Sequence, residues 1–333
     1  MKLATRLRHT VLPLTCGVLG LVAAACSQSV TGPTTSTAHA VAPATPARAM
    51  FHVEAMTNDP PRVSTYTQDF ERNFNQIMDW YAFDGSAFTN QAYQSRSGHP
   101  DPSNPDYAPG IDAAHASHFA RLLLGPTETD GGGYNLNEGP YTHWGGYSAK
   151  FPKNGYQTQL DIYLDCTWAG SHAQVGETTP KNSTSKFFDW DSAINDTSGN
   201  FKRDFVFNAA TYKGTYGSGF VISASENAFR ANVDPSSTGR NAVHILTSGW
   251  YTFKHRFFHQ VVGGTDILEC SLTITDANGI VMGQWTLPNQ AQGDTTDPIS
   301  TVGGNRYGWF ANQEIPNLPI DYARRVDNPG PND

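Results

Sequence analysis

Residues 249–310 carry the clearest pattern of hydrophobic and polar positions, and this pattern predicts a set of β-strands. Apolar and polar side chains alternate along residues 249–258 and again along residues 266–275. A period of two places alternate side chains on opposite faces of a strand. Asn278-Gly279 follows the second strand, and both residue types tolerate the positive φ of a tight hairpin turn. The stretch therefore predicts an antiparallel sheet with one buried face.

Further segments of strand character recur along the chain, with Gly, Asn, Ser and Pro between them. They are residues 115–125, 156–166, 203–209 and 219–224. Long helical periodicity is almost absent. Short strands at intervals with turn residues between them are typical of a β-sandwich. We therefore expect an all-β, antiparallel two-sheet sandwich in one domain over residues 63–327, a size that single β domains reach.

The first 25 residues predict a secretory signal peptide. Three basic residues precede an apolar run over residues 11–25, and small residues end that run immediately before Cys26. This junction resembles a bacterial lipoprotein processing site, which implies that Cys26 becomes the lipidated N-terminus. The alternative is ordinary cleavage nearby, with Cys26 incidental.

Residues 26–62 are rich in Ser, Thr, Ala and Pro and predict a flexible tether, and residues 328–333 predict a disordered tail. With Cys26 lipidated, the protein would be exported and anchored on the cell surface or in the periplasm. Without lipidation it would be secreted. The lipid would be its only contact with the membrane, since no later apolar segment is long enough to span a bilayer.

The charge argues against polyanionic partners. The formal net charge is -8, and removal of the three basic residues of the signal segment makes it more negative. Nucleic acids and anionic lipids are therefore not expected as partners. Charged residues make up 16% and aromatic residues 12% of the chain, a balance that suits neutral sugars better than polyanions.

Two cysteines, Cys166 and Cys270, remain once the signal segment and Cys26 are set aside. An oxidising compartment permits a disulfide between them. Cys270 lies on the apolar face of its strand, so two separate buried thiols are the alternative. The sequence leaves both open.

Several segments together resemble a family of largely uncharacterised secreted bacterial domains with the concanavalin A-like (lectin/glucanase) β-sandwich, or jelly roll. The resemblance lies in residues 69–71, 141–146, 159–165, 203–207, 249–253, 302–310 and 320–321, and it covers most of residues 64–327. It implies a sandwich fold and an extracellular location. The wider fold includes lectins, carbohydrate-binding modules, glycoside hydrolases and polysaccharide lyases, so the fold does not choose among these functions.

Binding of extracellular or cell-wall polysaccharide is the expected function. Sugar sites combine flat aromatic rings with groups that hydrogen-bond to hydroxyls. We expect an exposed Trp144, next to His143, to supply the ring. The polar face of the strand at 156–166 would supply the remaining contacts, namely Gln157, Gln159, Asp161 and Tyr163.

Two further functions stay open: an enzyme acting on glycans, and a structural or adhesion module without a glycan ligand. The Glu-x-Asp-x-x-Glu pattern of retaining glucanases is absent, and Asp161 and Asp165, roughly 13 Å apart on one strand, are too distant for that chemistry. A polysaccharide lyase needs a base beside groups that neutralise a uronate. The candidates are Tyr163, His255, Arg203 and Arg256.

No cofactor is required by this interpretation, but a structural calcium ion is a candidate. Asp69, Glu71 and Asp321 lie near the first and last strands and would offer carboxylate oxygens, which Ca²⁺ prefers. Solvated strand ends are the alternative. Zinc is not expected, because His115 and His118 would lie on opposite faces of a strand.

Overall fold

A computed structural model of the chain describes residues 64–83, 85–99, 107–124, 127–129, 135–173, 185–226, 240–287 and 296–330. The expected signal peptide, Cys26 and the tether lie outside the described residues, so these stay predictions. Of the expected tail, residues 331–333 are not described. Asn328, its first residue, is hydrogen-bonded, because its N–H donates to Gly155 O at 2.8 Å.

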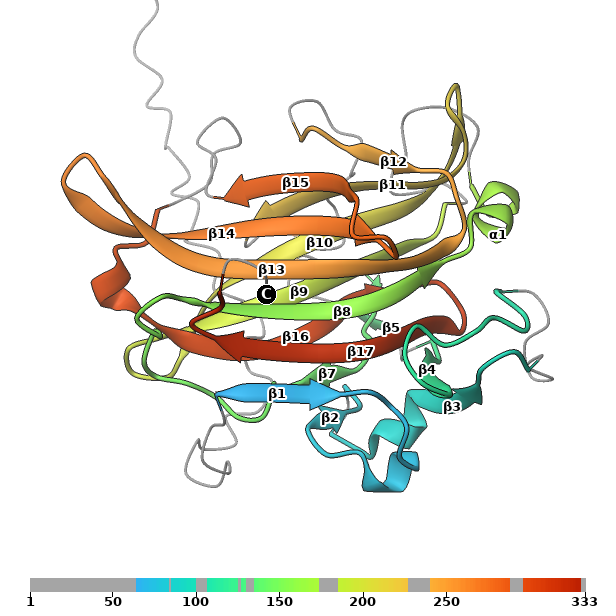
Figure 1. The fold of residues 1–333 in the computed structure, drawn as a ribbon, viewed down its shortest axis with the longest axis horizontal. Coiled ribbons are helices and arrows are strands. Elements are labelled where there is room, and N and C mark those ends of the chain that lie inside the picture. The colour runs from blue at the N-terminus through green and yellow to red at the C-terminus, as the bar shows by residue number, and fades with distance from the viewer. Residues whose placement is uncertain are drawn as a thin grey trace, which may run out of the picture. The chain divides into compact units, whose positions relative to one another are not determined.

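Two antiparallel sheets form the described fold (Figure 1). The eight-stranded sheet runs in the order β15 (Val281–Leu287), β14 (Thr265–Asp276), β13 (Gly249–Val262), β8 (Tyr156–Leu164), β17 (Leu318–Asp327), β4 (His118–Leu122) and β3 (Ala92–Arg96), and β1 (Thr65–Gln68) also pairs with β17. The seven-stranded sheet runs in the order β12 (Val243–Ile245), β11 (Gly217–Glu226), β10 (Phe201–Gly214), β9 (Phe187–Asp196), β16 (Val302–Gln313), β7 (Tyr141–Thr142) and β2 (Trp80–Tyr81). The expected all-β, antiparallel two-sheet sandwich is confirmed.

The remaining described elements are short. β5 (Thr127–Thr129) and β6 (Asn135–Asn137) form a separate two-stranded sheet. The helical segments are α1 (Cys166–Ser171) and the 3₁₀ turns η1 (Phe74–Gln76), η2 (Phe88–Asn90) and η5 (Ile299–Thr301). Within the described ranges, therefore, we find no helix with the length and apolar character needed to cross a membrane.

The expected hairpin is present between β14 and β15. Gly279 has φ 78, a conformation that costs glycine little and other residues more. Asp276 stabilises the turn, because its Oδ1 accepts hydrogen bonds from the N–H groups of Asn278 at 2.9 Å and Ile280 at 2.8 Å. The turn is therefore stabilised both by the Asp276 carboxylate and by the positive φ that Gly279 adopts.

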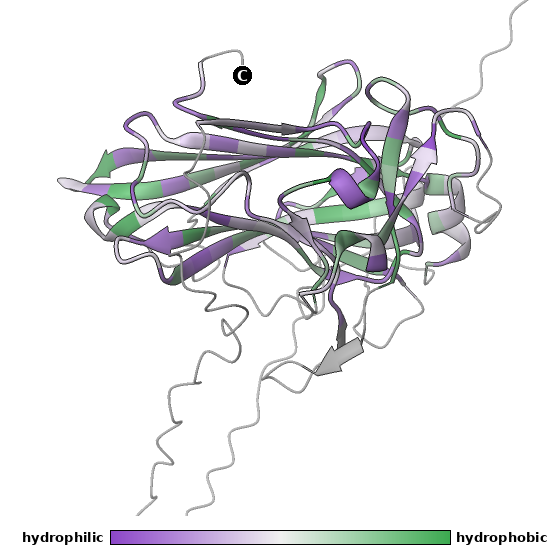
Figure 2. Cartoon of the chain, turned by 90° about the horizontal axis from the view of Figure 1, so that it is seen from below, coloured by the Kyte–Doolittle hydropathy of each residue, from purple (hydrophilic) through white to green (hydrophobic). Residues whose placement is uncertain are grey.

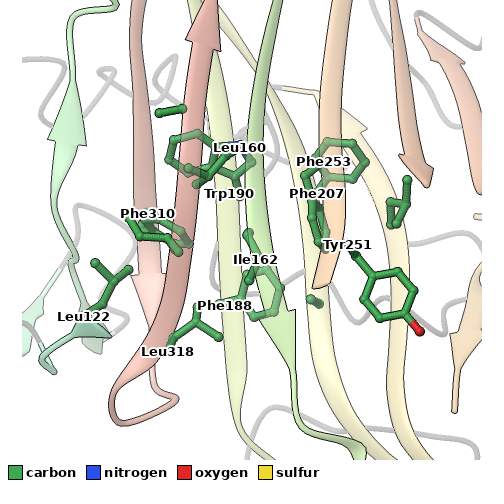
Figure 3. Packing of buried hydrophobic residues seen from close by; sticks show 14 of the residues in the cluster. Leu122, Leu160, Ile162, Phe188, Trp190, Phe207, Tyr251, Phe253, Phe310 and Leu318 are labelled. Atoms are coloured by element: carbon green, nitrogen blue, oxygen red, sulfur yellow. The ribbon is translucent and has the colours of Figure 1, made fainter. Parts of the chain in front are cut away.

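The hydrophobic core lies between the two sheets, where the apolar side chains on the inner face of each sheet meet (Figures 2 and 3). Phe253 of β13 packs edge-on against Phe188 of β9 and Phe207 of β10, with ring centroids 5.9 and 5.1 Å apart. All three side chains are fully buried. Each such ring contributes about 1.5–3 kcal/mol through removal of apolar surface from water.

A polar bridge crosses this core. Arg325 of β17 lies opposite Thr158 of β8 and is fully buried, so its side chain lies between the sheets. Its Nη1 donates to Asn305 Oδ1 of β16 at 2.8 Å. Asn305 Nδ2 donates in turn to His143 O at 3.3 Å and Gly146 O at 2.9 Å. The bridge therefore joins the two sheets and also fixes the segment after β7.

Both cysteines in the described residues are free thiols, so the disulfide alternative is wrong and the alternative of two buried thiols is confirmed. Cys270 is fully buried on β14, and Cys166 begins α1, where its Sγ lies 3.3 Å from Ile245 O. Burial raises the pKa of Cys166 to about 12, so this thiol stays protonated and unreactive.

Asn305→Ala is expected to destabilise the fold, because it removes the acceptor that the buried Arg325 guanidinium has on the opposite sheet. A buried hydrogen bond to a charged group typically contributes about 1.5–3 kcal/mol. Urea unfolding measures the loss. Asn154→Ala, at an exposed position, is the control and should stay within about 0.5 kcal/mol of the parent protein. A loss below about 1 kcal/mol for Asn305→Ala would show that the bridge contributes little.

Candidate functional site

One row of side chains crosses the outer face of the seven-stranded sheet, the face turned away from the core. The strand pairings set this row, which consists of Tyr81, Tyr141, Trp309, Asp191, Val206 and Ser225. Their chain neighbours Trp80, Phe310 and Trp190 point into the core. Alternation therefore places the row outside. One half of the row is aromatic, and the other half is mainly polar.

The aromatic half belongs to a group of five rings that we call the aromatic cluster: Tyr81, Tyr141, His143, Tyr147 and Tyr307. His143 is its centre, with ring centroids 4.8 Å from Tyr81, 5.3 Å from Tyr141 and 4.4 Å from Tyr147. His143 Nε2 lies 2.7 Å from the Tyr147 hydroxyl. The four tyrosines are half-buried, so the cluster presents ring surface and hydroxyl groups to solvent.

Next to the aromatic cluster lies a polar strip on β9, β10 and β11. It contains Asp189, Asp191, Asp204, Asn208, Ser223 and Ser225, each at most 2% exposed. Asn208 joins the strands, because its Nδ2 donates to Asp189 Oδ1 at 2.8 Å and its Oδ1 accepts from Ser225 Oγ at 2.6 Å. These buried carboxylates order the sheet face and do not present oxygens at the surface.

The expectation of an exposed Trp144 is wrong. The indole is fully buried and packs edge-on against Trp190 at 5.9 Å, on the core side of the sheet. Gly308 makes the room, since a Cβ at this position would lie 2.4 Å from Trp144 Cζ2. His143, the other predicted residue of this segment, points outward and is at the centre of the aromatic cluster.

The other predicted glycan-binding residues lie on a different sheet. Gln157, Gln159, Asp161 and Tyr163 occupy the outer face of β8 in the eight-stranded sheet. Gln157 and Asp161 are buried, while Gln159 and Tyr163 are half-buried. The structure therefore does not bring His143 and these four residues into one site, because the two outer faces lie on opposite sides of the core.

Two of the candidates for catalysis are engaged in the framework. His255 is fully buried and its Nε2 lies 3.0 Å from Phe205 O, and burial lowers its pKa to about 3. Arg203 binds two carboxylates, with Nε 2.6 Å from Asp297 Oδ2 and Nη1 2.6 Å from Glu226 Oε1. A catalytic role for these two side chains is therefore wrong.

The other two candidates lie at the surface of the eight-stranded sheet. Tyr163 and Arg256 are half-buried on its outer face, where Arg256 lies opposite Gln157. The Tyr163 ring packs edge-on against Trp250 at 5.4 Å, and burial raises its pKa. Neither of these contacts joins Tyr163 to Arg256.

The expected calcium ligands do not meet. Glu71 accepts hydrogen bonds from the N–H groups of Ser117 at 2.7 Å and His118 at 2.6 Å. Although burial opposes it, hydrogen bonds from the side chains of Ser117 and His118, together with these two N–H groups, lower the pKa of Glu71 to about 2. Asp69 is exposed, whereas Asp321 is fully buried. Over the part of the chain that the structure describes, no three acidic, His or Cys side chains are grouped as a metal site. The trio proposed for calcium is therefore wrong.

Asp321 instead takes part in a contact that fixes the loop before β4. It lies opposite Asp161 in the pairing of β17 with β8, and its Oδ2 accepts from His115 N at 2.9 Å. His115 Nε2 lies 3.0 Å from Asp161 Oδ2, and its ring stacks on Tyr322 at 4.1 Å. Burial, together with the Asp161 charge, raises the pKa of Asp321 to about 7, and the hydrogen bond to Asp161 raises the pKa of His115.

Comparison with known proteins adds little. No protein-family model and no curated protein matches the chain. Among solved structures, the winged bean acidic lectin in complex with methyl-α-D-galactose matches with a TM-score of 0.33 and 10% sequence identity, over 79% of this chain and 98% of the lectin chain. A similarity this loose says nothing about what this chain binds.

The stability that the fold gains from the protonated, buried carboxyl of Asp321 is expected to fall as pH rises. The folded state keeps a proton on Asp321 between pH 3.8 and about 7, where the unfolded chain has lost it. The stability from this group is therefore present at low pH and is lost as pH rises through 7, and the raised pKa of His115 acts in the same direction at higher pH.

Asp321→Asn removes the first of these two titrations. The difference in unfolding free energy between the parent protein and this variant should therefore change by about 2–3 kcal/mol between about pH 5 and about pH 8, as measured by urea unfolding. Titrations of residues that do not interact with Asp321 occur in both proteins and cancel in this difference. A difference that stays constant with pH would contradict the assignment.

Proposed function

We propose that this protein binds polysaccharide through the aromatic cluster on the outer face of the seven-stranded sheet. The observation that carries the proposal is the grouping of three half-buried tyrosines around His143, with Tyr307 joined to Tyr147 through Arg306. Tyrosine rings offer flat apolar faces with a polar end, the combination that sugar rings and their hydroxyls require. Tyr81 and Tyr141 are stacked at 5.3 Å with an interplanar angle of 26°, so each ring holds the other in place.

Binding is better supported than hydrolysis at this face. A glycosidase needs two carboxyl groups that reach the sugar. Two carboxylates of the neighbouring polar strip, Asp191 and Asp204, are fully buried. The groups at this surface are tyrosine rings and hydroxyls, which can bind a sugar but do not supply the carboxyl groups that hydrolysis needs.

The sequence supports a surface location for this binding protein. The expected signal peptide, the lipidated Cys26 and the Ser/Thr/Pro/Ala tether would hold the sandwich near extracellular or cell-wall glycan. Polysaccharide is then the partner, and the lipid is the only link to the membrane.

Tyr141→Ala is expected to weaken polysaccharide binding about tenfold, because it removes a ring from the middle of the aromatic cluster. Affinity electrophoresis against a panel of neutral and acidic polysaccharides identifies a ligand, and isothermal titration calorimetry then measures the loss. Tyr163→Ala is the matched control, since this half-buried tyrosine lies on the opposite sheet. The proposal fails if the parent protein binds no member of the panel, or if Tyr163→Ala is the more damaging change.

Cys26→Ser is expected to move the protein from the membrane fraction to the soluble fraction of a bacterial host, because the lipid has no other attachment point. Fractionation followed by immunoblotting measures this change. Cys16→Ser, inside the expected signal peptide, is the control and should leave the protein with the membrane. Retention of Cys26→Ser in the membrane fraction would contradict lipidation.

A further inference from the structure

We propose that the aromatic cluster takes acidic polysaccharides and that Arg306 binds the carboxylate of a uronic acid unit. This inference rests on the proposed function, since it names the class of glycan that the same face would bind. It differs from the expectation of neutral sugars, which came from composition and net charge alone.

Arg306 is a buried cation whose hydrogen-bond partners among the described residues are all neutral. Only 6% of the residue is exposed. Its Nη1 donates to Asn195 Oδ1 at 2.9 Å and Gly199 O at 3.1 Å, and both acceptors are uncharged. No carboxylate in the described ranges forms an ion pair with it. A buried charge without an opposite charge is costly, so an anion at this position would be bound favourably.

One edge of the Arg306 guanidinium is unused. Nε is buried and has no hydrogen-bond partner in the described structure. The two hydrogen bonds of the side chain both come from Nη1, which leaves Nη2 unused as well. The N–H groups of Nε and Nη2 are parallel and match the two oxygens of a carboxylate. This edge would therefore suit a bidentate contact, which requires the carboxylate to enter between the side chains that cover Nε.

The guanidinium lies directly against the rings that would hold the sugar. Its Cζ is 5.3 Å from the centroid of the Tyr147 ring and 5.8 Å from that of Tyr307. Both tyrosines are half-buried and belong to the aromatic cluster. A uronic acid carries its carboxylate directly on the sugar ring. A unit stacked on these tyrosines can therefore place its carboxylate between them, against Arg306.

The position also explains how an acidic protein could select an acidic ligand. The net charge of -8 repels polyanions at long range. A carboxylate paired with a buried guanidinium is poorly screened and is held by local contacts, so it does not require a positive protein surface. Selection of an acidic glycan would then depend on the contact with Arg306 and not on the net charge of the protein.

The test compares pairs of ligands that differ only in the carboxylate. Oligomers of glucuronate, galacturonate and mannuronate are titrated into the parent protein, each beside the same oligomer with its carboxyl groups reduced to hydroxymethyl. We expect at least one acidic oligomer to bind about tenfold more tightly than its reduced form. Equal affinity within every pair overturns the inference but leaves polysaccharide binding in place. Absence of binding by these oligomers and by the whole polysaccharide panel would remove the proposed function itself.

A variant locates the preference at Arg306. Arg306→Lys keeps the positive charge but loses the paired N–H groups of the unused edge, so the acidic and reduced oligomers should bind within about twofold of each other. Circular dichroism verifies that the variant is folded, and if it is not, the comparison in the parent protein still decides. An unchanged preference for the acidic form in folded Arg306→Lys would overturn the inference.

Discussion

The described fold depends on a polar contact inside an otherwise apolar core, the hydrogen bond from Arg325 to Asn305. A buried guanidinium requires acceptors, and Asn305 supplies one from the opposite sheet. The remaining hydrogen bonds of Asn305 hold the carbonyl groups of His143 and Gly146. The position of His143, and with it the centre of the aromatic cluster, therefore follows from a contact on the other side of the sheet.

The same network reaches Arg306. Asn195 Nδ2 donates to Asn305 O at 3.1 Å, and Asn195 Oδ1 accepts from Arg306 Nη1. Arg306 and Arg325 are thus linked through two asparagines across the seven-stranded sheet. Hydrogen-bonded chains of this kind stabilise their members cooperatively. Because of this link, the outer face and the core share one set of constraints at this end of the sandwich.

The sequence was sufficient for the fold class because the alternation of apolar and polar residues in β8, β13 and β14 is a local property. Asn278-Gly279 likewise predicts its hairpin, because this signal lies in two neighbouring residues. The site was predicted only in part, since His143 was identified but paired with the wrong neighbour. Alternation from Tyr141 onward already places position 144 on the core side, yet the space for its ring comes from Gly308, distant in sequence.

The residues that sequence reasoning missed are those whose role depends on pairing across the sheet. Asp189 and Asp191 alternate along β9, which is a local signal, but their connection to Asn208 needs the register of β10. Arg306 is a plausible site residue from the sequence, but its role rests on the absence of a carboxylate partner among the described residues, which the sequence does not show. Such information exists only after the strands have been assembled.

Arg325 also has a consequence for assembly. Its neighbour Arg324 is half-buried on the outer face of β17, whereas Arg325 is fully buried between the sheets. A shift of β17 by one residue against β8 would move every side chain of the strand, Ala323 and Val326 included, to the opposite face. In the direction that brings Val326 opposite Thr158, Asn305 would lose its donor and Arg324 would enter the core away from it. Because Asn305 lies on the other sheet, Arg325 favours the observed register when the two sheets pack together.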